Sequence, residues 1–246
     1  TSLEHEWKIL VNNLIENGIL SYMNFDGFLL PNLWMPPLYA YYLYFFSFFN
    51  LEDQNYLILI LSSQILLASA SVAVFYKINK LFFSQKISFY SSLILSLFPL
   101  YIYACSQISS ISLQVFLTIL FFYFFFQFVK KKNVSSIVLL SLTSGLLILL
   151  RGEFWAIFVL SLFYLFLFIK ISIKKILLII LVTLITVSPY LIRNVLIFEK
   201  ITVLESFGYN LWKGNHPLAM KNSRVEGAEM ADKNLLKQID AIPKDK

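Results

Sequence analysis

The sequence has few of the residues that build disulfides, zinc sites and tight turns. Its one cysteine, Cys105, cannot form a disulfide within the chain, and its two histidines, His5 and His216, belong to no Cys/His cluster of the zinc type. Charged residues make up 14% of the 246 residues, whereas about 25% is usual in soluble domains. These scarcities argue against a disulfide framework, structural zinc and a soluble globular fold.

Apolar and aromatic residues dominate the chain instead. Hydrophobic residues reach 59%, with 25 Phe and 14 Tyr, while Gly and Pro stand at seven each. Long apolar runs suit lipid-facing helices, whereas a membrane β-barrel needs alternating apolar and polar positions. We therefore predict an integral membrane protein of the all-α class, a polytopic bundle of membrane helices.

Six apolar runs are long enough, or nearly so, for a hydrocarbon core of ~30 Å, which needs about 20 helical residues. The predicted spans are about 56–77, 87–104, 108–129, 134–150, 153–170 and 176–192. Alternate connections are rich in lysine: Lys77, Lys80 and Lys86; Lys130, Lys131 and Lys132; Lys170, Lys174 and Lys175. The positive-inside rule places these connections in the cytoplasm, so 1–55 and 193–246 are expected outside. The same rule accounts for the net charge of +6 without nucleic acid as a partner.

The first outer segment, 1–55, is expected to hold two surface helices. Trp7, Leu10 and Leu14 recur at helical spacing and predict an amphipathic helix over about 4–17. The apolar run 38–49 would cover only ~18 Å as a helix, so we expect an interfacial or re-entrant helix there. The second outer segment, 193–246, ends in a charged tail, and both ends of the chain are expected to be truncated.

Several motifs occur in an order that resembles a known group of membrane enzymes. They are an acidic pair at Glu4 and Glu6, MPPLYAYYLYF at 35–45, LLRGEFW at 149–155, SPYLIRN at 188–194 and GYNLWKGNHP at 208–217. This order, along nearly the whole chain, is similar to the GT-C glycosyltransferases that use polyprenyl-phosphate-linked sugars, such as protein O-mannosyltransferases and aminoarabinose transferases. The last motif is the most specific of the set.

The resemblance implies a function and a place in the cell. It implies an inverting hexosyl- or pentosyltransferase that moves a sugar from a polyprenyl-phosphate donor to a lipid, glycan or protein acceptor. The active site would open to the non-cytoplasmic face, and a bacterial cytoplasmic membrane is the expected location. Two alternatives stay open: a membrane transporter, for which helices broken at mid-membrane would be typical, and a non-catalytic GT-C-like membrane protein.

Sugar transfer needs a base that takes the proton from the acceptor hydroxyl, and Glu4 and Glu6 are the candidates. Residues that are two positions apart in a helix point in directions that differ by ~200°, so only one of these two acids can face a site. Alternatively, both acids favour the dipole at a helix start. A divalent cation is a further possibility, with unknown ligands, and His5 beside Glu4 or Glu6 is a weak candidate to hold it.

Transfer also needs cations that stabilise the departing phosphate. Arg151 is predicted to bind the donor phosphate, because a guanidinium offers two parallel hydrogen bonds. The alternative is a salt bridge to Glu153 with the arginine reaching the membrane surface. Arg193 with Asn194 is likewise predicted to bind the donor phosphate, and the alternative is that the pair caps a helix end.

The remaining predicted substrate-binding residues follow the family motifs. Aromatic rings can stack on a sugar and amides can bond its hydroxyls, and Gly208 and Gly214 are expected to permit tight turns between them. The alternative is a compact loop that caps the bundle. A departure from the family is Gln114, which stands where relatives often have an acid. These predicted residues are Tyr209, Asn210, Trp212, Asn215 and His216, together with Pro37 and Tyr39.

Overall fold

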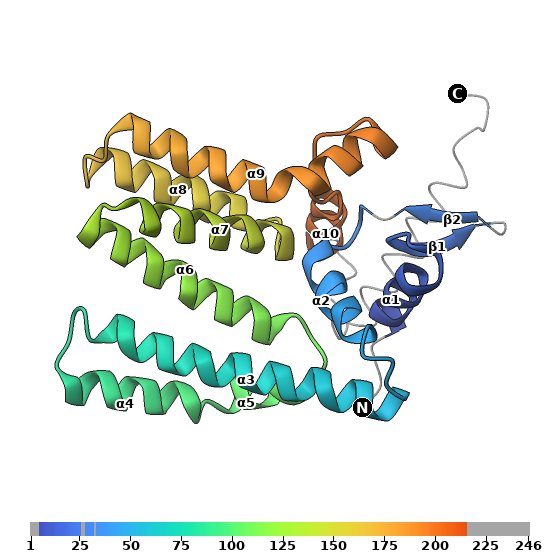
Figure 1. The fold of residues 1–246 in the computed structure, drawn as a ribbon, viewed down its shortest axis with the longest axis horizontal. Coiled ribbons are helices and arrows are strands. Elements are labelled where there is room, and N and C mark those ends of the chain that lie inside the picture. The colour runs from blue at the N-terminus through green and yellow to red at the C-terminus, as the bar shows by residue number, and fades with distance from the viewer. Residues whose placement is uncertain (1–4, 26–27, 32, 216–246) are drawn as a thin grey trace. The chain divides into compact units, whose positions relative to one another are not determined.

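The computed structural model describes residues 5–25, 28–31 and 33–215. Helices dominate them, which confirms the all-α membrane bundle, with one two-stranded hairpin. The elements are α1 (His5–Asn17), β1 (Ser21–Phe25), β2 (Phe28–Pro31), α2 (Pro37–Ser47), α3 (Asp53–Asn79), α4 (Gln85–Ser96), α5 (Pro99–Ser106), α6 (Ile111–Lys131), α7 (Val134–Leu150), α8 (Phe154–Leu167), α9 (Ile173–Phe198) and α10 (Ser206–Asn215). Figure 1 shows their arrangement.

The chain divides into two compact units, which we describe separately. The larger unit is Thr1–Asn32 with Pro36–Val203, and the smaller is Leu33–Met35 with Leu204–Lys246. The described part of the smaller unit contains α10 and a backbone bond from the Glu205 amide to the Leu33 carbonyl, at 3.0 Å. The candidate arginines both belong to the larger unit.

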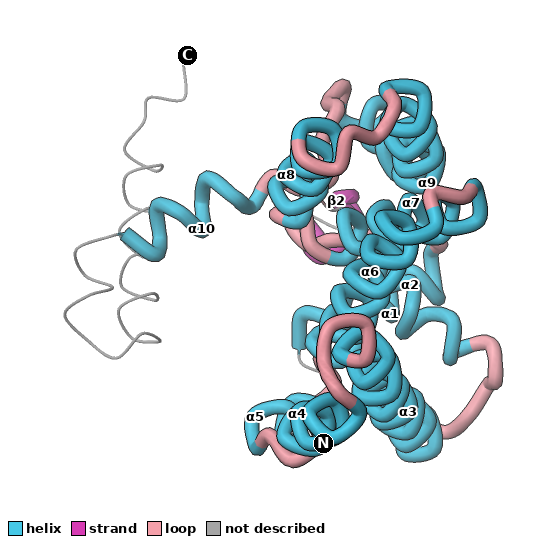
Figure 2. The backbone as a smooth tube through the Cα atoms, turned by 90° about the vertical axis from the view of Figure 1, so that its left-hand side faces the viewer, coloured by secondary structure: helices cyan, strands magenta, loops and turns pink. Residues whose placement is uncertain are grey.

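The larger unit is built on a row of four packed helices. Neighbouring contacts join α3 to α6, α6 to α7 and α7 to α9, while α4 and α5 flank α3, and α8 lies beside α7 and α9. Figure 2 looks along these helices and shows the row from α3 through α6 and α7 to α9. Much of the outward surface is apolar, with exposed side chains such as Leu66, Leu160 and Leu196. Such a surface suits lipid.

A helix or a helix pair lies at each of the six predicted spans, but the number of spans is not settled by helix length. Three helices, α3, α6 and α9, are long and apolar enough to cross a membrane. Helices α4 and α5 are together long and apolar enough to form one further span, with a bend of 50° between them. α7 and α8 are apolar but shorter, at 17 and 14 residues. The count of six therefore stays a prediction.

The two predicted surface helices form, and a β-hairpin joins them. The α1 side chains Trp7, Leu10 and Leu14 are buried, as the helical spacing predicted, but they pack inside the protein against α2 and β1. The Trp7 ring meets the Tyr39 ring edge-on, with centroids 4.8 Å apart. Between α1 and α2, where the sequence led to no prediction of secondary structure, strands β1 and β2 pair with Met23 opposite Leu30.

The lysine-rich connections lie at one end of the larger unit. Figure 1 shows the α3–α4, α6–α7 and α8–α9 turns together at the left of the helices. The α1 and α2 helices and the hairpin lie at the opposite end, with the carboxyl ends of α7 and α9. One end of the larger unit thus carries nine lysines, from Lys77 to Lys175, in its three turns and in the helix ends beside them. The opposite end carries Arg151 and Arg193.

Candidate functional site

Helices α7 and α9 run in the same direction and bring Arg151 and Arg193 to the same end. Three contacts follow one another along both helices. The Lys175 ammonium donates to the Lys132 carbonyl, at 2.6 Å, and the Thr183 hydroxyl donates to the Ser141 carbonyl, at 3.3 Å. Further along, Gly145 faces Thr186 so closely that an added Cβ would lie 2.6 Å from the threonine Cβ. The absence of a side chain at Gly145 therefore permits the close approach of these two helices.

Arg151 caps the carboxyl end of α7 and is half-buried. Its Nε donates to the Gln114 Oε1 at 3.1 Å, and a terminal nitrogen reaches the Ser110 hydroxyl at 3.5 Å. Glu153 is exposed, and no ion pair joins it to Arg151 in the described chain. Neutral partners orient the guanidinium without cancelling its charge, and this leaves it suited to an anion.

Arg193 lies in the last turns of α9, since this helix continues to Phe198, beyond the predicted span limit of 192. Its guanidinium donates to the Asn194 Oδ1 at 2.7 Å and to the Leu20 carbonyl at 3.4 Å. It also lies over the Tyr190 and Phe198 rings, 5.4 and 5.6 Å from their centroids. An amide, a backbone carbonyl and two aromatic rings thus help to hold the Arg193 guanidinium in place.

Asn194 is fully buried and joins α9 to the segment that follows it. Its amide nitrogen donates to the Thr202 carbonyl at 2.7 Å, and its oxygen accepts from Arg193. The helix ends at Phe198, and Glu199, which caps it, adopts a left-handed conformation with φ of 56°. These bonds agree with the alternative that Asn194 acts as a helix-end cap. The bond to Arg193 also lets Asn194 position the guanidinium.

A cavity of about 490 Å³ lies beside Arg193. Arg193 is the one charged residue among the described residues that line it. Pro37, one of the predicted binding residues, forms part of its wall at the start of α2. The other lining residues come from the α1–β1 connection and from α2, α7 and α9: Gly18, Ile19, Leu20, Leu38, Tyr41, Leu149, Thr186, Pro189, Tyr190 and Ile197. An apolar cavity with a single cation suits a ligand that joins an anion to a hydrocarbon chain.

Pro189 shapes the wall of this cavity from within α9. A proline inside a helix cannot donate to the carbonyl four residues earlier, which here belongs to Ile185. The Ser188 hydroxyl donates to that carbonyl at 2.9 Å and replaces the missing bond. The motif SPYLIRN thus places a helix irregularity one turn before Arg193.

Tyr39 is buried within the protein, with 1% of its surface exposed. Its hydroxyl donates to the Gln64 Oε1 at 2.9 Å, and the Gln64 amide donates to the Gln107 carbonyl at 2.7 Å. The neighbouring Tyr42 hydroxyl bonds with Ser63, and burial raises the pKa of Tyr42 more than this bond lowers it. Tyr39 therefore holds α2 against α3, and Tyr42 stays protonated at neutral pH.

The other predicted site residues fall at the two ends of the described chain. Glu4 and His216 lie outside the described residues, and the side chains of Glu6, Tyr209 and Asn210 are not described. The GYNLWKGNHP motif does not form the expected tight turns at Gly208 and Gly214, because both glycines lie within α10. Trp212 is half-buried, and the exposed Asn215 donates to the Leu211 carbonyl at 2.7 Å. Within the described ranges there is no group of three metal-ligating side chains, so a cation at His5 stays a prediction.

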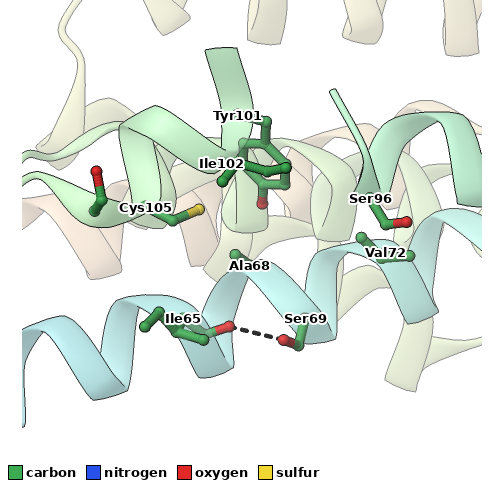
Figure 3. A pocket seen from close by; sticks show the side chains of 9 residues that line it. Ile65, Ala68, Ser69, Val72, Ser96, Tyr101, Ile102 and Cys105 are labelled. Atoms are coloured by element: carbon green, nitrogen blue, oxygen red, sulfur yellow. Dashed lines mark hydrogen bonds between the residues drawn. The ribbon is translucent and has the colours of Figure 1, made fainter. Parts of the chain in front are cut away.

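A second cavity, of about 500 Å³, is the larger one but lacks charged lining residues in the described chain. Figure 3 shows Ile65, Ala68 and Val72 of α3 facing Tyr101 and Cys105 of α5. The dashed line there marks the Ser69 hydroxyl, which donates to the Ile65 carbonyl. The described lining offers the hydroxyls of Ser69, Ser96, Tyr101 and Ser106 but no cation to balance the charge of a phosphate.

Sequence reasoning did not find the groups that orient the arginines. Gln114 was noted only as a departure from the family, and Ser110, Tyr190 and the Leu20 carbonyl were not singled out. Tyr190 precedes Arg193 by three residues, a spacing that puts both on one helix face, and this was the available signal.

The family model for dolichyl-phosphate-mannose-protein mannosyltransferases matches residues 32–192. The match runs from the segment before α2 through most of α9 and includes Pro37, Gln114 and Arg151. No curated protein and no solved structure matches the chain. The match covers more than half of the sequence, and together with the apolar helices it shows an integral membrane protein of glycosyltransferase type. The chain belongs to the dolichyl-phosphate-mannose-protein mannosyltransferase family, a family of GT-C membrane glycosyltransferases.

Proposed function

We propose that this chain transfers a sugar from a polyprenyl-phosphate donor to a lipid, glycan or protein acceptor at the non-cytoplasmic face of a membrane. The carrying observation is that Arg151 and Arg193 lie at the carboxyl ends of the parallel helices α7 and α9, and that Arg193 lines an apolar cavity there. Nine lysines lie in the three turns at the other end or in the helix ends beside them, and the positive-inside rule assigns that end to the cytoplasm. The arginines would then face the donor on the opposite side.

The donor fits the cavity at Arg193. Its phosphate would pair with a guanidinium, and its polyprenyl chain would lie against apolar walls such as Leu38 and Ile197. The half-buried Arg151, on the adjacent helix, would supply a second cation for the phosphate that leaves. Binding by two arginines lowers the energy of the transition state, because negative charge grows on the phosphate oxygen as its bond to the sugar breaks.

The chemical step would be a single displacement. Glu4 or Glu6 takes the proton from the acceptor hydroxyl, and the hydroxyl oxygen attacks the anomeric carbon. The bond between that carbon and the phosphate oxygen breaks, and its electron pair leaves with the polyprenyl phosphate. Attack from the face opposite the leaving group inverts the anomeric configuration. The sugar and the acceptor are left open, and the α10 residues Trp212 and Asn215 are candidates to contact them.

The transporter alternative would draw on the break between α4 and α5, since broken helices are typical of substrate sites in transporters. The cavity beside that break has no charged lining residue among those described, so it offers an ion no opposite charge. The family match also favours sugar transfer.

The test is a transfer assay with the full-length protein and labelled polyprenyl-phosphate sugars, with a panel of hydroxyl acceptors. Glu4→Gln and Glu6→Gln are each compared with the unmodified protein, and Glu52→Gln serves as an exposed acidic control. We expect one of the first two to lower kcat by at least about 100-fold, the size usual for a lost general base. Full activity in both variants would overturn the assignment of the base. Absence of transfer by the unmodified protein with every donor would overturn the proposed function.

A further inference from the structure

A third cavity, of about 330 Å³, lies where α1 meets the start of α3. It shares no lining residue with the cavity at Arg193. Its polar lining includes Lys8 and Asn12 from α1, with Asn50 and Asp53 from the α2–α3 connection and the start of α3. Ile15 and Leu57 contribute apolar walls. The cavity therefore combines charged, amide and hydrocarbon groups.

The position of this cavity corresponds to the membrane surface. Asp53 is the first residue of α3, one of the candidate spans. Immediately before it, Phe48 and Phe49 expose 66% and 55% of their surfaces, and Leu51 is also exposed. Large apolar side chains beside the start of a span are typical of the interfacial layer of a bilayer. A ligand in the cavity would have its polar part at headgroup level and its apolar part toward the lipid.

The charges around the cavity indicate what kind of headgroup it would take. Lys8 and Asp53 are both exposed, carry opposite charges and line the same cavity, and no ion pair joins them in the described chain. An anionic ligand would meet the Asp53 carboxylate, and a cationic ligand would meet the Lys8 ammonium. A ligand that carries both charges can pair with both residues at once.

We propose that this cavity binds a membrane phospholipid with a zwitterionic headgroup of the phosphoethanolamine kind. The lipid phosphate pairs with Lys8, and the lipid ammonium pairs with Asp53. The Asn12 and Asn50 amides are placed to bond phosphate or ester oxygens, while the acyl chains lie against Ile15 and Leu57. The inference is independent of the sugar-transfer reaction, because the residues that carry it belong to neither the arginine site nor the candidate base.

Lipid retention by the purified full-length protein tests the proposal. The protein is delipidated in detergent, and phosphatidylethanolamine or phosphatidylglycerol is added in equal amounts and counted by native mass spectrometry. We expect phosphatidylethanolamine to be retained preferentially and to raise the melting temperature, since a ligand of the folded state stabilises it. Lys8→Ala and Asp53→Asn should each weaken retention by about threefold to fivefold, the size expected for one exposed ion pair.

Matched variants separate the cavity from general effects of charge. Glu52 is the acid next to Asp53 but does not line the cavity. The Glu52→Gln variant should therefore retain lipid fully. Lys8→Arg keeps the positive charge and should keep binding, which distinguishes lost charge from lost folding. Soluble phosphoethanolamine, which has no acyl chains, should give no shift in melting temperature.

Three results would overturn the proposal. Equal retention of phosphatidylglycerol would show that the headgroup ammonium is not recognised. Unchanged retention in Lys8→Ala and Asp53→Asn would place the lipid elsewhere. A melting shift by phosphoethanolamine as large as that by the lipid would assign the cavity to a free phosphate compound.

Discussion

At the scale of residues, the two arginines could be predicted from the sequence, but their partners could not. Arg151 and Arg193 stand out because a cation near the end of an apolar run needs an anion or water. Their orienting groups come from distant elements: Gln114 precedes Arg151 by 37 residues, and Leu20 precedes Arg193 by 173. No local pattern encodes contacts of that separation. Tyr39 was predicted at the substrate site from its motif, whereas its burial against Gln64 depends on how α2 packs on α3.

Gln114 provides a test of how Arg151 acts. A Gln114→Glu change would place a carboxylate about 3 Å from the guanidinium and neutralise much of its charge. We expect the KM for the polyprenyl-phosphate donor to rise by about tenfold, the equivalent of ~1.4 kcal/mol, and kcat to fall as well, because Arg151 also stabilises the charge that grows on the leaving phosphate. Steady-state kinetics with varied donor would measure this.

The control for this change is Gln85→Glu, which adds the same charge at the exposed start of α4. It should leave the KM unchanged. An equal KM for Gln114→Glu and the unmodified protein would show that the charge of Arg151 does not reach the donor.

At the scale of elements, helices were predictable from apolar runs, while their ends and interruptions were less so. The predicted limit of 192 for the last span follows the apolar pattern, whereas α9 continues to Phe198, and Asn194 in its last turns donates to the Thr202 carbonyl beyond it. The β-hairpin was missed although Asp26 and Gly27 stand between Phe25 and Phe28, a pair typical of two-residue hairpin turns. The segments on both sides, 4–17 and 38–49, are predicted as helices, and the strands between them are only five and four residues long.

The packing of α7 on α9 yields a prediction at Gly145. A Gly145→Ala methyl group would lie 2.6 Å from the Thr186 Cβ and 3.3 Å from the Thr183 carbonyl. The two helices would have to separate, and we expect a loss of about 1–3 kcal/mol in unfolding free energy. Thermal or denaturant unfolding in detergent would measure it.

A second change at Thr186 makes this prediction specific. Thr186→Gly removes both threonine atoms that the methyl group would meet, so the double variant should recover part of the loss seen in Gly145→Ala. Gly208→Ala is the control, because an added Cβ there has no neighbour within 4 Å. Additive effects of the two changes would contradict a direct clash between α7 and α9.

At the scale of the whole molecule, the distribution of charge predicts how the chain crosses the membrane. Lysines from three separate turns gather at one end of the larger unit, which the sequence alone anticipated from alternate connections. The family match spans residues 32–192, from the segment before α2 through most of α9. The number of spans depends on whether α7 and α8, which are short, cross fully, and apolar length does not decide this.

Cysteine labelling in sealed right-side-out vesicles tests this topology. In a Cys105→Ser background, Glu153→Cys should react with a membrane-impermeant maleimide before lysis, because it is exposed at the arginine end. Gln85→Cys, exposed beside the lysine-rich α3–α4 turn, should react only after the membrane is opened. The reverse labelling pattern would invert the proposed orientation.

The central claim is that the arginine end holds the donor phosphate, and it is tested most directly by binding of polyprenyl phosphate without its sugar. The dissociation constant would be measured for the reconstituted full-length protein and for Arg151→Gln, Arg193→Gln and, as a control at the opposite end, Lys80→Ala. Charge-assisted hydrogen bonds contribute about 1.5–3 kcal/mol, so each arginine change should weaken binding by roughly 10-fold to 100-fold. Lys80→Ala should bind as the unmodified protein does. Equal dissociation constants for all four proteins would contradict the claim.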